Sequence, residues 1–155
     1  MVDRSFGADG FGRMARRMLA AFLLAASASG FASSTVGTAA SFYGAWHVDS
    51  IVGYGEVSVS DDELRRLVGQ QVVISKDSLK IGSDDCSVNE MQASEQDITS
   101  LLLREYKAGR KDAGLSARTL ALNAEPCGYV FRSGKGIVVY QDGAFYRASR
   151  AKRAY

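Results

Sequence analysis

The chain has few of the residues on which metal and nucleophilic chemistry most often depend. Its 155 residues include one histidine, His47, and two cysteines, Cys86 and Cys127. These three residues are too few for a four-ligand zinc site of the usual cysteine–histidine type. No serine lies in a G-x-S-x-G turn, and a serine–histidine–carboxylate triad would have to use His47. We therefore predict no metal, no cofactor and no catalytic residue; a hydrolase that uses His47 is the alternative.

The chain also lacks long hydrophobic runs and, beyond its first 32 residues, an excess of either charge. Its strongly apolar run, residues 18–26, is too short for a membrane-spanning helix, which needs about 20 residues. The chain has 19 basic residues, of which four lie in 1–32, and 17 acidic residues, of which two lie there. Residues 33–155 therefore contain 15 of each. A neutral domain lacks the positive charge typical of a nucleic-acid binder. We predict neither a nucleic-acid partner nor a membrane span in the mature form.

Proline is almost absent: the chain has 16 glycines but a single proline, Pro126. This composition excludes a collagen-like chain and favours β structure with turns at glycine. Strand-like patterns occur in eight short segments: 46–52, 57–59, 72–74, 79–81, 119–122, 127–131, 137–140 and 144–146. Gly53-Tyr54-Gly55 predicts a break after the first, and Asp142-Gly143 a hairpin between the last two. The fold is predicted to be mainly β, a small antiparallel barrel or strongly curved sheet of about seven or eight short strands with one or two short helices.

Capping signals predict where these two helices begin and end. Ser60 and Glu63 have the spacing of a capping box, and the helix that they start ends at Gly69. Ser94 is the predicted N-cap of a second helix, which ends at Gly109.

The N-terminal segment has the organisation of a secretory signal peptide. Arginines within 13–17 precede the apolar run, and small residues follow as far as Ala32. Cleavage is expected after Ala28 or Ala32, and we take 1–32 as the signal peptide; a buried first helix of the domain is the alternative. The protein is therefore predicted to be exported, either periplasmic or secreted.

The mature chain is predicted to form one domain. Residues 33–41 are small and mostly polar and predict a flexible entry, followed by a single β-barrel-like domain over 42–150. Residues 151–155 form a basic tail, which is either a solvated end or a contact for an anionic envelope polymer. We expect a monomer.

The two cysteines are predicted to form a disulfide. An exported chain meets an oxidising compartment in which thiols pair. A bridge from Cys86 to Cys127, with 40 residues between them, would stabilise the fold by about 4 kcal/mol in the chain-entropy model. A metal-binding pair or a catalytic thiol is the alternative.

Gly44-Ala45-Trp46 opens the first predicted strand, and Arg147 and Arg150 follow the last one. This arrangement resembles the lipocalins and the wider calycin group, in which a G-x-W tryptophan near the start of the barrel is covered by an arginine from near its end. The resemblance implies a lipocalin-like barrel closed by Trp46 and Arg147, or Arg150, with a structural role for both. A guanidinium on indole contributes about 0.5–2 kcal/mol.

Aromatic residues on or beside the predicted strands supply candidates for ligand binding. We single out Tyr54, Tyr129, Tyr140 and Tyr146, because a tyrosine at the mouth of a barrel offers an apolar body and a polar tip; core packing is the alternative. The function predicted is an exported non-enzymatic binding module for a small apolar or amphipathic ligand, with an interior cavity of roughly 300 Å³ or more.

A protein-binding role is the alternative function. Small exported β domains also serve as inhibitors or immunity proteins of cell-envelope hydrolases, an analogy at the level of class. Such a protein would present a protruding loop or an apolar patch, which we expect in 53–59 or 107–118.

Overall fold

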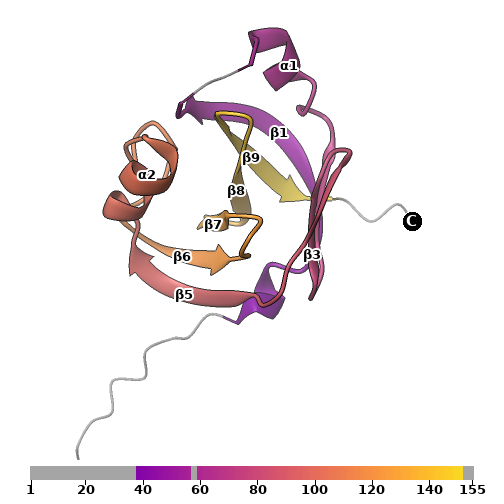
Figure 1. Ribbon diagram of the computed structural model, residues 1–155, viewed down its shortest axis with the longest axis vertical. Coiled ribbons are helices and arrows are strands. Elements are labelled where there is room, and N and C mark those ends of the chain that lie inside the picture. Colours follow the sequence, from indigo (N-terminus) through magenta and orange to yellow (C-terminus); the bar gives the residue numbers. More distant parts are fainter. Residues whose placement is uncertain (1–37, 57–58, 152–155) are drawn as a thin grey trace, which may run out of the picture. The chain divides into compact units, whose positions relative to one another are not determined.

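A computed structural model describes residues 38–56 and 59–151 (Figure 1). The predicted signal peptide, most of the flexible entry, residues 57–58 and the end of the basic tail lie outside these residues. The elements are η1 (Ala39–Ser41), β1 (Gly44–Tyr54), α1 (Asp61–Arg65), β2 (Gln71–Ile74), β3 (Ser78–Ile81), β4 (Asp84–Ser87), β5 (Gln92–Asp97), α2 (Thr99–Tyr106), β6 (Arg118–Asn123), β7 (Tyr129–Ser133), β8 (Gly136–Gln141) and β9 (Ala144–Arg150). None of the helices described is both long and apolar enough to cross a membrane.

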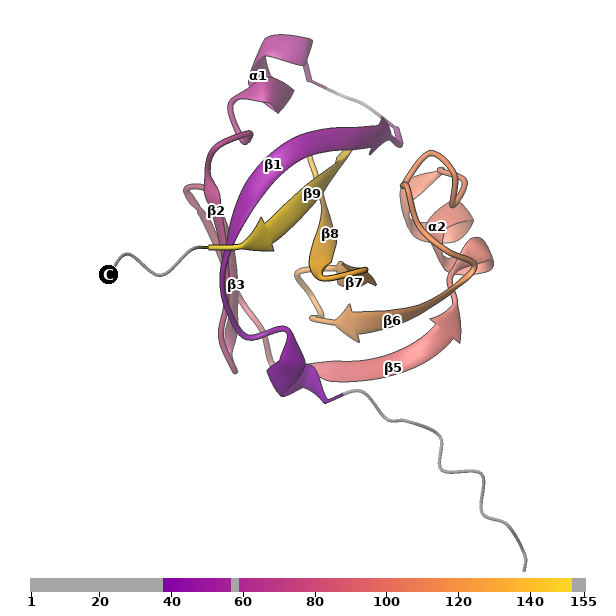
Figure 2. The same cartoon turned by 180° about the vertical axis from the view of Figure 1, so that it is seen from behind.

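All nine strands belong to one antiparallel sheet with the order β4-β3-β2-β1-β9-β8-β7-β6-β5. Consecutive strands pair along each arm, and β1 joins β9, with Trp46 opposite Arg150. Two irregularities in the β1–β9 register, after Val48 and after Ile51, bend the long first strand. The result is a curled half-barrel, seen from the two sides in Figure 1 and Figure 2, and its edge strands β4 and β5 follow each other in the chain. The prediction of a mainly β, antiparallel fold with two helices is confirmed.

Two of the nine strands, β4 and β5, have no counterpart among the predicted segments. Their sequences, DDCS and QASEQD, are polar, because an edge strand has little side-chain surface to bury and its charges oppose pairing with another chain. Gly82, at φ +60°, makes the turn before β4. The turn is short, since Asp84 and Asp85 already belong to β4.

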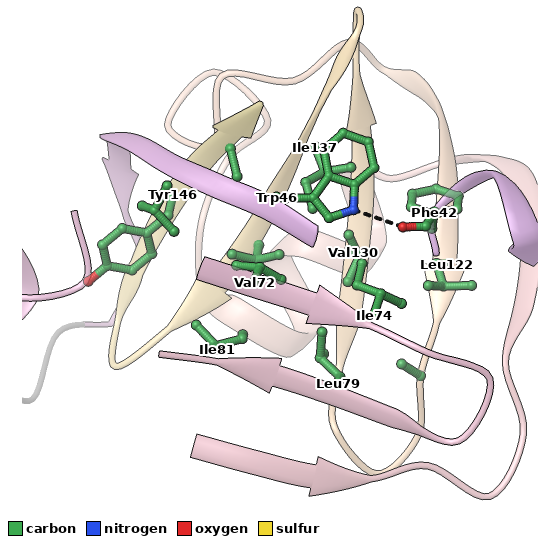
Figure 3. Packing of buried hydrophobic residues seen from close by; sticks show 14 of the residues in the cluster. Phe42, Trp46, Val72, Ile74, Leu79, Ile81, Leu122, Val130, Ile137 and Tyr146 are labelled. Carbon is green, nitrogen blue, oxygen red and sulfur yellow. Dashed lines mark hydrogen bonds between the residues drawn. The ribbon is translucent and has the colours of Figure 1, made fainter. Parts of the chain in front are cut away.

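The interior of the half-barrel is filled by apolar side chains from almost every strand (Figure 3). Its largest fully buried members include Trp46, Phe42, Ile74, Leu122 and Ile137. We call this set the interior core. The strands β6–β9 also bury their other face, where a second cluster contains Phe131, Val138 and Phe145 together with Leu102 of α2. We call this side of the sheet, covered by α2 and the segment 107–117, the helix face.

Helix α1 begins as the sequence predicted. The side chain of Ser60 accepts a hydrogen bond from the Glu63 N–H, and Glu63 accepts one from the Ser60 N–H, so the capping box is confirmed. Leu64 is buried in the interior core, and its carbonyl accepts a hydrogen bond of 3.1 Å from the Tyr146 hydroxyl. Helix α1 is thereby fastened to strand β9.

The predicted start of the second helix is wrong. Ser94 lies on β5, opposite Ala121 of β6, and α2 begins only at Thr99. There the Asp97 carboxylate accepts the Thr99 N–H at 2.8 Å, and this hydrogen bond lowers the pKa of Asp97. Pairing with β6 overrides the local capping signal at Ser94, because the ladder satisfies backbone groups along a whole strand.

The predicted break after the first strand is present but begins later than predicted, at Gly55, because β1 continues to Tyr54. The two glycines are needed for close approach of another segment. A Cβ on Gly53 would collide with the backbone carbonyl of Asp112, and one on Gly55 would lie 2.5 Å from the carbonyl oxygen of Tyr106. The segment after α2 therefore packs directly on the backbone at the end of β1.

Candidate functional site

Trp46 lies in the interior core with no exposed surface, and its Nε1–H donates to the carbonyl of Phe42 at 2.8 Å (Figure 3). The guanidinium of Arg150 lies over the indole at 3.8 Å from the ring centroid. It also donates to the carbonyls of Tyr43, at 2.6 Å, and Ser41, at 2.9 Å. Gly44 has φ +118°, and a Cβ there would lie 2.6 Å from Arg150 Nη1. The G-x-W glycine thus makes room for this arginine.

Of the two arginines that the resemblance offered, Arg150 covers Trp46 and Arg147 does not. Arg147 is exposed on β9, and its guanidinium lies beside Gly114 of the segment that follows α2. Because the two arginines are three positions apart along a strand, their side chains leave opposite faces of the sheet.

A second guanidinium, that of Arg132 on β7, accompanies Arg150. It lies 4.4 Å from the Phe42 ring centroid and 5.4 Å from that of Trp46. Its Nη2 donates to the carbonyl of Ser41 at 2.9 Å and contacts the Ser41 hydroxyl at 3.1 Å. Burial, and to a smaller extent the charge of Arg150, lower the pKa of Arg132. The sequence analysis missed this residue, since no local pattern distinguishes it from other strand arginines.

The four tyrosines singled out from the sequence do not line one cavity. Tyr146 has no exposed surface and belongs to the interior core. Tyr129 and Tyr140 are partly buried against the helix face, and Tyr54 is 48% exposed at the end of β1. Strand alternation separates them, because neighbouring residues point to opposite sides of a sheet.

Tyr129 and Tyr140 pack into an aromatic cluster around Tyr106 of α2. The ring centroids of Tyr106 and Tyr140 are 4.4 Å apart, and Phe145 lies 4.9 Å from Tyr140. The Tyr106 hydroxyl accepts the Tyr129 N–H at 3.1 Å, and burial raises the pKa of Tyr106 to about 12. These contacts are those of a packed core, so the cluster holds α2 on the sheet.

The surface hollows of the described residues include four of about 350–490 Å³, and none of these four is lined by a buried member of the interior core. One of them, of about 490 Å³, lies between the end of β1 and the segment after α2. It is lined by Ile51, Val52, Gly53, Tyr54, Lys111 and Asp112. Tyr54 is one of three exposed large apolar side chains in the described residues, with Val68 and Leu103, and it alone borders this hollow.

Beside the hollow lies the segment 107–112, which is exposed except at Ala108 and which we call the basic loop. Lys107, Arg110 and Lys111 are exposed, and Asp112 accepts the Gly109 N–H at 2.9 Å. Ala108 within the loop, and Ala113 and Leu115 after it, are buried in the helix-face cluster. Between described residues the one ion pair joins Arg104 and Glu105, so these three cations have no acidic partner there. The loop is held in place by these buried residues, and its three cations form no ion pair with a described residue.

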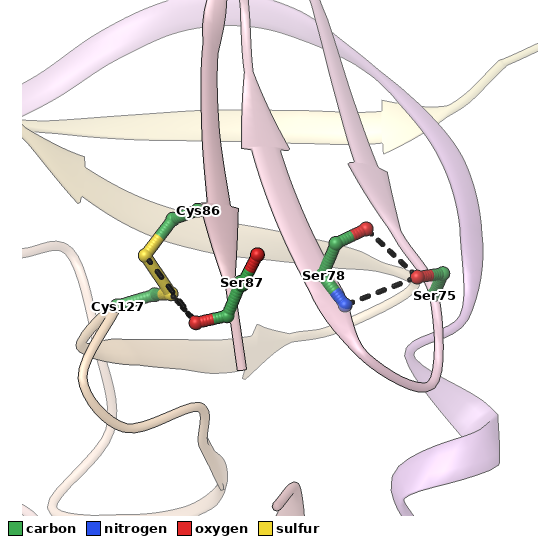
Figure 4. The surroundings of a disulfide bond; sticks show 5 residues. All are labelled: Ser75, Ser78, Cys86, Ser87 and Cys127. Atoms are coloured by element: carbon green, nitrogen blue, oxygen red, sulfur yellow. Dashed lines mark hydrogen bonds between the residues drawn. A yellow bond between two sulfur atoms is a disulfide. The ribbon is translucent and has the colours of Figure 1, made fainter. Parts of the chain in front are cut away.

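The remaining candidates lie apart from this hollow. His47 is exposed on β1, between Gln71 and Ser149 of the neighbouring strands. The disulfide between Cys86 and Cys127 is present and joins edge strand β4 to the turn between β6 and β7 (Figure 4). No group of three potential metal ligands occurs within 38–56 and 59–151.

The fold and its contacts define a disulfide-bonded antiparallel half-barrel with a packed interior and an exposed basic loop. The chain matches no known protein-family model, no curated protein sequence and no solved structure.

Proposed function

We propose that this protein is an exported, non-enzymatic binding module that recognises a protein partner through Tyr54 and the basic loop. The observation that carries the proposal is the packing of the interior core. Trp46, Phe42 and Tyr146, its largest side chains, are fully buried there, so the space that a carrier of small molecules would keep open is occupied.

Both sides of the interior core are closed by specific contacts. Leu64 of α1 is buried in it and bonded to Tyr146, and Phe42, after η1, packs beside Trp46 under Arg132 and Arg150. A small apolar ligand would need roughly 300 Å³, and none of the four hollows named above in the described part of the chain is lined by a buried residue of this core. An interior ligand would have to displace several of these side chains, which argues for recognition at the outer surface.

Export is supported by the signal-peptide pattern of residues 1–32 and by the paired cysteines. Disulfides persist in oxidising compartments and are rare in reducing ones. A partner is therefore expected in the cell envelope or the medium.

The chemistry of the surface indicates an acidic partner. Tyrosine and arginine are enriched among residues that dominate protein interfaces, and Tyr54 and Arg110 are both exposed at this end of the molecule. Lys107 and Lys111 form no ion pair with a described residue. They add positive charge, which favours encounter with a negative surface. The anchored base of the basic loop lowers the entropy lost on binding.

A cell-envelope hydrolase is the partner class that we propose. Glycoside hydrolases carry a pair of carboxyl groups at the bond that they cleave, which provides an anionic site for a basic loop. The protein would then act as an inhibitor or immunity protein. The resemblance to lipocalins concerns the closure of the barrel by Trp46 and an arginine, and it agrees with a binding role without requiring an interior ligand.

Site-specific photo-crosslinking tests the proposal. A photoreactive residue is placed at Tyr54, at Lys111 or, as a control, at Asp85 on the exposed edge strand β4. We expect positions 54 and 111 to crosslink the same envelope protein and position 85 not to.

Charge reversal by Lys111→Glu with Arg110→Glu should weaken this complex at least tenfold, whereas Lys80→Glu on β3 should not. Crosslinking from position 85 alone, equal effects of the two charge reversals, or binding of an anionic polymer instead of a protein would contradict it.

A further inference from the structure

Two guanidiniums from different strands converge on one carbonyl oxygen beside the Trp46 indole. Nη2 of Arg132 and Nη2 of Arg150 both lie 2.9 Å from the oxygen of Ser41. The two nitrogens can therefore be no more than 5.8 Å apart. One ligand oxygen at hydrogen-bond distance from both nitrogens fits within this separation.

No acidic side chain balances these two charges in the described part of the chain. The one ion pair between described residues lies elsewhere, at Arg104. The flanking segments 33–41 and 147–153 contain no aspartate or glutamate. Two positive groups held this close repel each other, and the charge of Arg150 adds to burial in lowering the pKa of Arg132. An anion bound between them would relieve this repulsion.

Both guanidiniums keep hydrogen-bond donors for such an anion. A guanidinium has five N–H groups. Arg150 uses Nη1 and Nη2 on the carbonyls of Tyr43 and Ser41, and Arg132 uses Nη2 on Ser41. In both residues Nε makes no hydrogen bond with a described residue. Arg150 is exposed and Arg132 is half-buried, so solvent and small ions can reach the pair.

We propose that Arg132 and Arg150 form a binding site for a phosphate group. The planar fork of arginine matches the oxygens of phosphate and carboxylate. A carboxylate has two oxygens, which a single fork can satisfy, whereas a phosphate dianion offers three oxygens and a double charge to two forks. The stacking of the guanidiniums on Trp46 and Phe42 holds them in place before the ligand arrives, which reduces the entropy lost on binding.

Titration of the purified chain with inorganic phosphate, at constant ionic strength maintained with chloride, tests this site. Trp46 is the only tryptophan and lies under Arg150, so its fluorescence reports on the pair directly. We expect a saturable change that chloride alone does not produce. Arg132→Gln should weaken phosphate binding at least tenfold, and Arg147→Gln, a matched arginine on β9, should leave it unchanged. A change that does not saturate, or equal effects of the two variants, would overturn the proposal.

A measurement on the unaltered chain covers the case in which Arg132→Gln does not fold. Side-chain Nε–H resonances of Arg132 and Arg150 should shift on adding phosphate, while those of Arg147 and Arg118 should not; uniform shifts of all four would refute the site.

Repeating the titration with glycerol 3-phosphate identifies the source of the phosphate group. Tighter binding than inorganic phosphate indicates a phosphate carried by a larger molecule, and weaker binding indicates the free ion. Both outcomes require the same two arginines.

Discussion

The backbone carbonyl of Asp112 packs against the Cα of Gly53 so closely that no side chain fits between them. This contact sets the position of the basic loop relative to Tyr54, the next residue on β1. The proposed recognition surface therefore depends on a glycine that contributes no side chain to it.

Gly53→Ala should move the basic loop away from β1. Overpacking of this kind costs about 1–3 kcal/mol, and we expect a loss of that size in the free energy of unfolding, measured with urea, together with weaker crosslinking of the partner from position 111. Gly134→Ala is the control. Gly134 has φ +56° and open space around it, so alanine there should cost about 1 kcal/mol through backbone strain alone and leave partner binding intact.

Arg150→Ala should destabilise the fold by about 2.5–4 kcal/mol. It removes the stacking on Trp46, about 0.5–2 kcal/mol, and the hydrogen bonds to Tyr43 and Ser41, about 1 kcal/mol each. The shift of the urea midpoint, followed by Trp46 fluorescence, measures the loss. Arg147→Ala on the same strand should change stability by less than about 0.5 kcal/mol. Equal losses in the two variants would show that stacking on Trp46 contributes nothing.

Removing the disulfide should cost about 4 kcal/mol in the chain-entropy model, because Cys86 and Cys127 are separated by 41 positions. The bridge also joins the edge strand β4 to the β6–β7 turn, which no strand pairing does. Urea unfolding of Cys86→Ser with Cys127→Ser, compared with the unaltered protein, gives the value. A reductant should lower the stability of the unaltered protein to the same level and leave the double variant unchanged. A reductant effect on the double variant would show that another process is being measured.

Stability should fall as the pH rises from about 10 to about 12. Burial raises the pKa of Tyr146 to about 12, with the charge of Asp142 adding to the shift, and burial also raises the pKa of Tyr106 to about 12. In the unfolded chain a tyrosine ionises near pH 10. Below that pH the stabilisation is complete. Between the two values the unfolded chain loses protons that the folded chain keeps, so the free energy of unfolding decreases by at most about 1.4 kcal/mol per pH unit for each tyrosine.

Tyr146→Phe and Tyr106→Phe should each reduce this slope in urea titrations at pH 10, 11 and 12. Tyr146→Phe also removes the hydrogen bond from the Tyr146 hydroxyl to the Leu64 carbonyl, so it should cost about 1 kcal/mol at neutral pH. An unchanged slope in both variants would assign the alkaline instability to other groups.

Local signals in the sequence predicted the elements that depend on local chemistry. The capping box of Ser60 and Glu63 is one. The Asp142-Gly143 hairpin is another, since both residues have positive φ, as a two-residue turn of this type requires. The pairing of Cys86 with Cys127 followed from their number and the expected compartment. In each case the feature is caused by a few residues that are adjacent in the sequence, or follows from the number of cysteines.

Features that depend on distant contacts were missed. Ser94 has a good capping environment, yet pairing with β6 places it on a strand. The polar strands β4 and β5 lack the alternation of apolar and polar residues by which strands are recognised in a sequence. The buried second face of β8 could have been inferred from the continuous run Ile137 to Tyr140, since strands buried on both sides lose alternation. No pattern of neighbouring residues marks Arg132 as part of a site, because its hydrogen-bond partner Ser41 lies 91 positions away in the sequence.

Native mass spectrometry of the protein recovered from the exported fraction tests most directly whether recognition occurs outside a filled core. We predict a chain that carries no apolar molecule, that is lighter by the two hydrogens of its disulfide, and that forms a complex with one acidic protein which Lys111→Glu with Arg110→Glu disrupts. A retained apolar molecule, released by organic extraction, on a chain that binds no protein would contradict the account.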